Sequence, residues 1–183
     1  MPKLNNLTKE SVLAAGIKLV RSEQEVSARN LANLLNCSTQ PIYSLYSNMN
    51  NLKDDLRIAI QKLHKEKIDY YIKNSSYPKY KAFGMGFVKF AKEEREPFNY
   101  LFMKNNGSPY ETAMKDYYSE IHSLISKDYG IPLETAEQFH LDMSVYSFGL
   151  AIMVYLGVDL TEEEISNRLT AEFSALKKIY LEK

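Results

Sequence analysis

Cysteine is almost absent from this chain. A single residue, Cys37, occurs among 183, so the fold cannot rely on an internal disulfide. Cys37 follows an apolar segment, where a small packed residue is a more ordinary interpretation than a redox switch. Glycine and proline are also few, at seven and six. The composition is that of an ordinary globular protein, long enough for one large domain or for a small domain attached to a larger one.

Neither sign of charge is in excess, because 23 Lys and Arg balance 23 Asp and Glu. This balance argues against a protein that coats nucleic acid non-specifically. The charges are unevenly distributed, however, since the residues up to Lys53 include six Lys and Arg but only three Glu. Taken alone, this mild positive excess is explained equally well by an ordinary solvated surface.

Long hydrophobic runs are also lacking. The most apolar stretch, residues 143–158, contains two serines and two tyrosines and is shorter than the roughly 20 residues that span a membrane. We therefore interpret it as a buried helix and expect no membrane partner. The polar start of the chain lacks the apolar core and cleavage site of a secretory signal, so we expect a cytoplasmic protein.

Helical periodicity is present in almost every long segment, and no segment has the alternation of a strand. The sequence therefore predicts an all-α fold of about nine helices. Polar breaks are expected at residues 74–80 and 105–109. The predicted helices cover residues 11–21, 28–36, 39–45, 50–73, 81–94, 97–104, 110–129, 133–156 and 161–180.

Residues typical of helix ends support several of these boundaries. Thr8, Ser27 and Ser38 are expected to cap the first three helices, and Thr161 with Glu164 forms the pattern of a capping box. Asn36 tolerates the left-handed conformation of a tight turn, and Gly130 and Gly157 follow the seventh and eighth helices. In the second helix we expect Leu31, Leu34 and Leu35 to be buried and Arg29, Asn30 and Asn33 to face outward.

The second and third helices are unusually short. Isolated helices below ~12–15 residues are marginal in water, so a specific role must require this brevity. A helix followed by a short helix, a turn and another short helix is the order of a helix-turn-helix module, whose last helix enters the major groove of DNA.

Residues 31–52, LANLLNCSTQPIYSLYSNMNNL, resemble the signature of the TetR family of transcriptional repressors. In that signature an isoleucine or leucine followed by alanine begins the core of the second helix, and an aromatic pair closes the third. Asn36 and Cys37 stand where the family usually has glycine and valine. Met49 stands where it often has a phosphate-binding lysine, for which Lys53 is a candidate replacement. The matching positions are Leu31, Ala32, Ser38, Ile42, Tyr43, Tyr46 and Leu52.

The resemblance implies a DNA-binding domain over residues 1–52 and a ligand-sensing and dimerisation domain over residues 53–183. Phosphate contacts would fix the orientation of the module, whereas base contacts would supply sequence specificity. The implied phosphate contacts are Thr8, Ser27, Tyr43 and Lys53. The implied base contacts are made by Thr39, Gln40 and Ser44, by Pro41 to a thymine methyl group and by Arg29 to a guanine edge. Ser38 is the remaining residue that the resemblance places at the DNA.

A homodimer is expected on a palindromic operator, because one recognition helix contacts too few base pairs to distinguish an operator from other DNA. The helices over 139–156 and 161–180 resemble the pair that forms a four-helix dimer bundle in the family. Burial inside the monomer is the alternative for part of this surface. The predicted interface residues are Phe148, Gly149, Ile152, Leu169, Phe173 and Leu176.

The middle of the chain is expected to bind a small-molecule effector. Residues 87–102 resemble a stretch found in a subset of these regulators, and 14 tyrosines, eight phenylalanines and seven methionines supply apolar walls. Ordinary core packing is the alternative for each candidate. The pocket candidates are Phe90, Phe102, Met103, Tyr117, His122, Met143 and Tyr146.

Motifs of catalysis or metal binding are missing. His122 and His140 could meet in space, but no carboxylate or thiolate pattern accompanies them, so we expect no metal site. Gly84 and Gly86 follow no strand, and neither HExxH nor GxSxG occurs, so we expect neither an enzyme nor a cofactor. The sequence thus predicts a ligand-responsive repressor. It leaves open a DNA-binding adaptor that recruits a protein and binds no small molecule, and a helical enzyme that carries the short-helix pattern.

Overall fold

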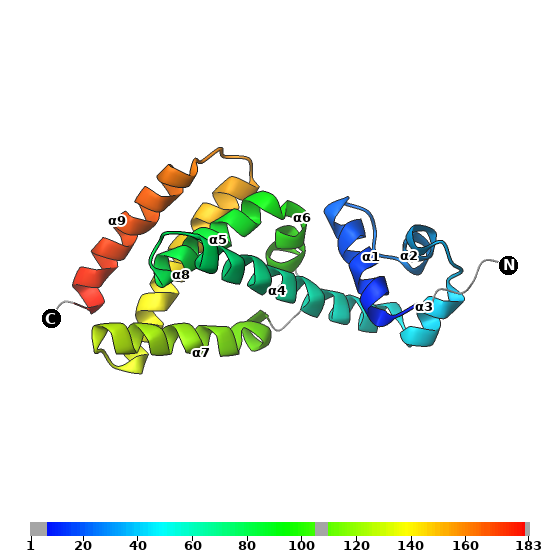
Figure 1. Ribbon diagram of the computed structural model, residues 1–183, viewed down its shortest axis with the longest axis horizontal. Coiled ribbons are helices and arrows are strands. Elements are labelled where there is room, and N and C mark those ends of the chain that lie inside the picture. Colours follow the sequence, from blue (N-terminus) through cyan, green and yellow to red (C-terminus); the bar gives the residue numbers. More distant parts are fainter. Residues whose placement is uncertain (1–6, 105–109, 182–183) are drawn as a thin grey trace. The chain divides into compact units, whose positions relative to one another are not determined.

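The computed structural model describes residues 7–104 and 110–181, and the side chains of residues 7–104 and 118–181. The described residues form nine α-helices and one short π-helix and contain no strand, which confirms the all-α prediction (Figure 1). Within them, no helix combines the length and apolar character needed to cross a membrane. The elements are α1 (Lys9–Arg21), α2 (Ala28–Leu35), α3 (Gln40–Leu45), α4 (Met49–Asn74), α5 (Lys79–Glu93), α6 (Arg95–Phe98), η1 (Asn99–Met103), α7 (Tyr110–Tyr129), α8 (Leu133–Tyr155) and α9 (Glu162–Tyr180).

The chain divides into two compact units. The first comprises Met1–Leu63 and Glu94–Asn106, and the second comprises His64–Glu93 and Gly107–Lys183. The boundary therefore falls inside α4, whereas the boundary predicted from the sequence lies after residue 52. The difference arises because the first half of α4 is part of the core of the first unit, where Leu56 is fully buried.

The first unit is built on a close approach between α1 and α4. Gly16 of α1 lies against Leu56, and a Cβ added at Gly16 would stand 3.0 Å from Leu56 Cδ1. A Cβ at this position would therefore require a small shift of the buried Leu56 side chain. The other fully buried side chains of the helix-turn-helix region are Val12, Leu31, Ile42 and Leu52.

The segment after α5 differs from the single helix predicted over residues 97–104. α6 begins at Arg95, before Pro97, because a proline is tolerated throughout the first turn of a helix. The chain then widens into the π-helix η1, where the Lys104 N–H donates to the Asn99 carbonyl oxygen at 3.0 Å.

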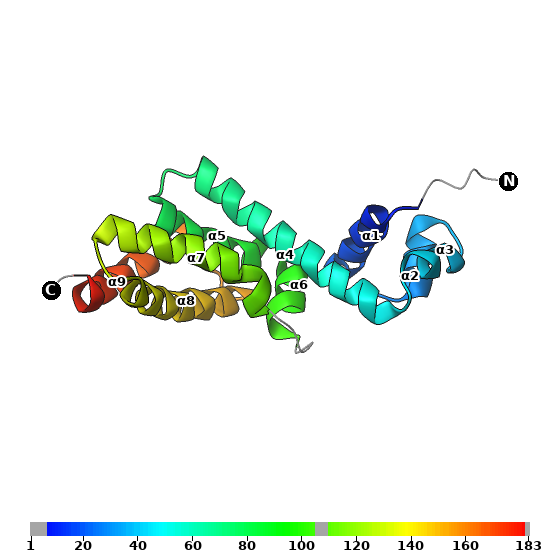
Figure 2. The ribbon, with the colours of Figure 1, turned by 90° about the horizontal axis from the view of Figure 1, so that it is seen from below.

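The second unit is a helical bundle in which α5 packs against α8 and α9, and α8 also packs against α7 and α9 (Figure 2). Aromatic side chains pack together where α5, α8 and α9 meet. Phe139 of α8 is fully buried and meets Phe173 of α9 edge to face, with ring centroids 5.4 Å apart. Tyr80 of α5 lies beside both rings, at 5.8 and 6.0 Å.

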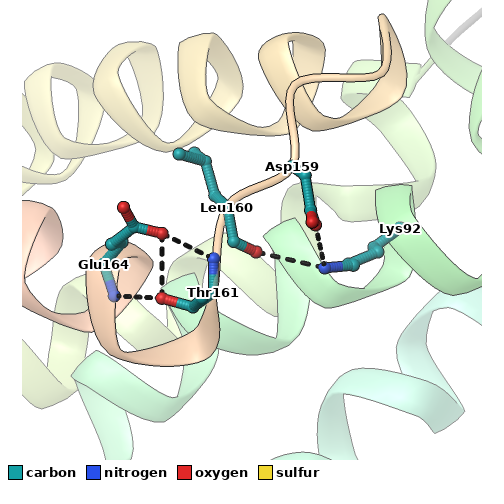
Figure 3. A network of polar contacts seen from close by, with 5 residues as sticks. All are labelled: Lys92, Asp159, Leu160, Thr161 and Glu164. Carbon is teal, nitrogen blue, oxygen red and sulfur yellow. Dashed lines mark hydrogen bonds and ion pairs between the residues drawn. The ribbon is translucent and has the colours of Figure 1, made fainter.

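The start of α9 confirms the predicted capping box (Figure 3). The Glu164 N–H donates to Thr161 Oγ1 at 3.2 Å, and the Thr161 N–H donates to Glu164 Oε2 at 2.8 Å. Lys92 of α5 donates to the Leu160 carbonyl oxygen at 3.1 Å and to the Asp159 carboxylate at 3.2 Å. The turn between α8 and α9 is thereby attached to α5.

Candidate functional site

The turn between α2 and α3 has the geometry predicted from the sequence. Ser27 caps α2, and its Oγ accepts a hydrogen bond from the Asn30 N–H at 3.3 Å. Asn36 ends α2 in the left-handed conformation, with φ of 51°. The Cys37 N–H donates back to the Ala32 carbonyl oxygen at 3.0 Å, so the chain reverses within a few residues.

The predicted role of Ser38 as a helix cap is wrong. The N-cap of α3 is Thr39, and α3 has no side-chain cap hydrogen bond. The physical reason is Pro41, which lies in the first turn and has no N–H that could donate a hydrogen bond to a capping side chain. Ser38 is instead an exposed residue of the turn.

The buried face of α2 also differs from the prediction. Leu31 is fully buried as expected, but Leu34 is 44% exposed. The face that packs consists of Ala28, Leu31 and Ala32, with Leu35 half-buried, which is the spacing i, i+3, i+4, i+7 of a single helical stripe. Leu34 falls outside this stripe and belongs to the outer surface.

The helix α3 presents half of its residues, Gln40, Tyr43 and Ser44, to solvent. Ile42 is fully buried and Leu45 is half-buried, so these residues attach α3 to the core of the first unit. Tyr43 is 50% exposed, and Thr39 and Gln40 are also exposed. Within the described part of the chain, the side chains of these three make no hydrogen bond or ion pair and are available to a partner.

The other predicted DNA contacts also belong to the first unit, and none is buried. Arg29 lies on the outer surface of α2. Thr8 caps α1, where the Ser11 N–H donates to its Oγ1 at 3.2 Å. Ser44 is exposed and donates to the Gln40 carbonyl oxygen at 3.1 Å, and Pro41 is half-buried.

Lys53 has surroundings that the sequence does not indicate. It is exposed and lines a polar hollow of about 860 Å³ together with residues of α1, α4, α6 and η1. Carboxylates in this hollow would compete with a phosphate for the ammonium group of Lys53. The acidic lining residues are Glu23, Glu25, Asp54 and Glu96.

A second cavity, of about 430 Å³, lies within the second unit between α5, α7 and α8. Of the seven pocket candidates, His122 and Met143 line it. Sequence reasoning missed most of its walls, because the residues left around a gap depend on how three helices pack. The lining residues are Tyr80, Phe83, Gly84, Phe87, Tyr118, His122, Glu137, His140, Leu141, Met143, Ser144, Val145, Ser147 and Phe148.

Two further pocket candidates of the second unit lie away from this cavity. Phe90 is buried in the core beside His64 of α4, with ring centroids 4.6 Å apart. Tyr146 is half-buried on α8 but does not line the cavity. The cavity face of α8 includes His140, Ser144 and Ser147, and Tyr146 points away from that face.

Two of the remaining three candidates, Phe102 and Met103, do not line the cavity. Phe102 and Met103 belong to η1 in the first unit. Phe102 packs on Phe98, with ring centroids 4.8 Å apart, and Met103 is exposed. The side chain of Tyr117 lies outside the described residues.

Polar groups gather at one end of the cavity, where the two histidines are in contact. The rings of His122 and His140 have centroids 5.1 Å apart. The Tyr80 hydroxyl is 3.0 Å from His140 Nδ1, and Ser144 Oγ is 3.4 Å from His140 Nε2. His122 Nδ1 is 3.8 Å from Glu137 Oε1. The described residues contain no group of three side chains that could hold a metal ion.

Burial keeps these imidazoles neutral at pH 7. It lowers the pKa of His140 to about 4, with a further contribution from the neighbouring His122. It also lowers the pKa of His122, against an opposing effect of Glu137. Burial raises the pKa of Tyr80, so its hydroxyl stays protonated. The cavity therefore offers hydrogen-bond donors and acceptors from neutral groups.

Part of the predicted dimer interface is buried within the chain. Leu169 and Leu176 of α9 are only 3% and 8% exposed, and Phe173 packs on Phe139. For these residues the alternative, burial inside the monomer, is correct, because the apolar stripe of α9 faces the bundle. Phe148 and Ile152 are half-buried, and Gly149 is exposed.

An apolar surface on α8 remains exposed. Val145 is 67% exposed, and other large apolar side chains lie at helical spacing from it. Gly149, one turn further on, is part of the same face. We call this surface the α8 stripe, and its exposed apolar residues are Leu141, Val145, Met153 and Leu156.

Comparison with known proteins supports the fold. No family model and no curated protein matches the sequence. A solved structure from Pseudomonas aeruginosa PAO1, provisionally described as a transcriptional regulator, superposes with a TM-score of 0.71 at 14% identity. The match covers 97% of this chain and 95% of that one. The chain therefore shares its whole helical architecture with that protein.

Proposed function

We propose that the protein is a DNA-binding transcriptional regulator of the TetR type, a repressor that a small effector releases from a palindromic operator. The observation that carries this proposal is the surface of α3, where Ile42 fixes the helix and Gln40 and Tyr43 stay exposed without a partner among the described residues. The description of the structural neighbour as a regulator supports the same class.

The exposed groups match the chemistry of DNA. A glutamine amide such as that of Gln40 can bind the N6 and N7 groups of adenine in the major groove, and Arg29 can bind a guanine edge. The Tyr43 hydroxyl would donate to a phosphate and fix the register of the module. The oxygens of Thr8 and Ser27 already cap their helices, so their role would be to shape the helix starts that approach the phosphates.

A second copy of the chain would cover the α8 stripe. Two recognition helices related by a two-fold axis would then bind two half-sites, which supplies the discrimination that one helix lacks. Apart from its chain neighbours and its own helix backbone, no atom of the described residues lies within 4 Å of a Cβ placed on the exposed Gly149, which leaves room for close approach of a partner helix. The α8 stripe replaces the buried residues of α9 as the proposed centre of the interface.

Ligand response would act through α4. Phe87 lines the cavity of the second unit, and its ring centroid is 5.6 Å from that of His64 on α4. α4 is continuous from Met49 to Asn74, so a displacement of His64 can be transmitted to the half of α4 in the first unit. By linkage, the effector must bind more tightly to the conformation that does not bind DNA.

The proposal is tested by selecting DNA from a randomised pool with the full-length protein. The expected result is an enriched inverted repeat. Gln40→Ala and Tyr43→Ala should fail to retain it, whereas Asn167→Ala, a change at an exposed residue of α9, should retain it. Selection of no sequence, or equal retention by all variants, would contradict the proposal.

The adaptor alternative shares the DNA interface and assigns the α8 stripe to another protein. Light scattering separates the two interpretations, because the regulator should be a dimer in the absence of any other protein. A monomer that binds DNA would favour the adaptor.

A further inference from the structure

We propose that the cavity between α5, α7 and α8 binds an uncharged aromatic molecule that carries one hydroxyl or carbonyl group, and that His122 contacts this group. This inference rests on the proposed function, because it assigns a chemical class to the effector. The inference rests on the apolar walls of the cavity, on the hydrogen bonds among its polar groups and on the charges that line it.

The body of the cavity is apolar and aromatic. The rings of Phe87 and Phe148 lie on its wall, with centroids 6.2 Å apart, and Phe83, Leu141 and Val145 add further apolar surface. The volume of about 430 Å³ falls within the range of ~300–1,000 Å³ typical of small-molecule sites. A flat ring system can meet these walls by offset or edge-to-face contact.

The polar end of the cavity is ordered by hydrogen bonds. His140 is buried between the Tyr80 hydroxyl at 3.0 Å and Ser144 Oγ at 3.4 Å, so both of its nitrogens face protein groups. His122 stands next to it and is half-buried at the cavity wall. The 3.8 Å separation between His122 Nδ1 and Glu137 Oε1 exceeds hydrogen-bond distance. Among the described residues no hydrogen bond occupies His122, which keeps its hydrogen-bonding capacity for a ligand, and the ring of His140 packs against it.

The charges that line the cavity select against ions. Among the described residues around it, Glu137 is the one that carries a full charge, and no Lys or Arg is present. A carboxylate ligand would lose its hydration without meeting a cation. An ammonium ligand would meet neutral imidazoles and a carboxylate whose side chain is half exposed and well screened. A neutral hydroxyl or carbonyl group avoids the loss of ion hydration that either charged ligand would suffer.

A matched set of naphthalene probes tests this selectivity. Calorimetry on the full-length protein at pH 7.5 would compare 2-naphthol, 2-acetylnaphthalene, naphthalene, 2-naphthoate and 2-naphthylmethylammonium. We expect 2-naphthol or 2-acetylnaphthalene to bind more than tenfold tighter than either ion. Tighter or equal binding of an ion, or binding of no probe, would overturn the inference.

The role of His122 is tested by His122→Phe, which keeps a ring but removes both nitrogens. Loss of one net hydrogen bond should weaken binding of the preferred probe about threefold to tenfold and leave naphthalene unaffected. Ser174→Ala on the exposed surface of α9 is the matched control. Unchanged affinity for the preferred probe in a folded His122→Phe variant would overturn the assignment. The preference of the unmodified protein for 2-naphthol over naphthalene is a second test that needs no variant.

The same probes distinguish a failure of this inference from a failure of the proposed function. A probe that binds as expected but leaves DNA affinity unchanged supports the cavity assignment and contradicts effector release. Retention of selected DNA without binding of any probe contradicts the cavity assignment and leaves the DNA-binding function intact.

Discussion

Arg21 and Glu94 form a bidentate ion pair within the first unit. The guanidinium donates from Nε at 2.8 Å and from Nη2 at 2.6 Å to the two oxygens of the Glu94 carboxylate. The Glu94 side chain is only 8% exposed, although that of Arg21 is 45% exposed. The pair connects the last residue of α1 to the residue before α6, so it joins the helix-turn-helix region to a segment 73 positions away.

Replacing Arg21 by alanine should therefore destabilise the first unit. A buried carboxylate would lose two charge-assisted hydrogen bonds, and we expect a loss of about 1.5–3 kcal/mol. Urea unfolding would measure it. Lys65→Ala, which removes an exposed ion pair with Asp69, should cost less than about 1 kcal/mol. Equal effects of the two substitutions would contradict the account.

Gly16 should tolerate no branched side chain. Gly16→Val would force new atoms against Leu56, and overpacking of this kind typically costs about 1–3 kcal/mol. The Gly16→Val, Leu56→Ala double variant should lose less stability than the sum of the two single variants, because the second change makes room for the first. Additive losses would show that the two residues do not constrain each other.

Stability should fall as the solution is acidified below pH 6.5. Burial lowers the pKa of His64 to about 3 and that of His140 to about 4, so the unfolded chain binds protons that the folded chain does not. Unfolding is therefore favoured as pH falls from about 6.5 towards 4. The decrease in Tm from pH 7.5 to pH 5 should be smaller in His64→Phe than in the unmodified protein. An identical decrease would show that His64 is not the neutral buried group described.

The α8 stripe should control assembly. Val145→Glu places a charge at a site that is 67% exposed in the monomer, so it should leave the fold intact and separate a dimer into monomers. Light scattering reports the mass directly. Ile58→Glu, at an exposed position of α4 in the first unit, is the control and should remain dimeric. A dimer that survives Val145→Glu would place the interface elsewhere.

Local chemistry made the helix ends predictable. Asn36, Gly130 and the Thr161–Glu164 capping box end or begin helices where their conformational and hydrogen-bonding properties require it. The same reasoning fails at Ser38, because Pro41 in the first turn of α3 has no N–H to donate to a capping side chain.

Tertiary packing made the rest unpredictable. The apolar stripe of α9 was recognisable, but whether Leu169 faced another copy or its own bundle depended on the position of α5 and α8. Phe90 and Met143 are both apolar, yet of these two it is Met143 that lines the cavity between α5, α7 and α8. A cavity is volume that neighbouring helices leave unfilled, and no single residue type marks it.

The most direct test of the account measures equilibrium binding to the selected DNA and to versions with one substituted base pair per half-site. Gln40→Ala should lose discrimination at one position, by about 1–3 kcal/mol, while Tyr43→Phe should weaken binding to every sequence alike. This pattern would assign base contact to Gln40 and phosphate contact to Tyr43. Affinities and sequence preferences unchanged in both variants would contradict the claim that the exposed surface of α3 binds DNA.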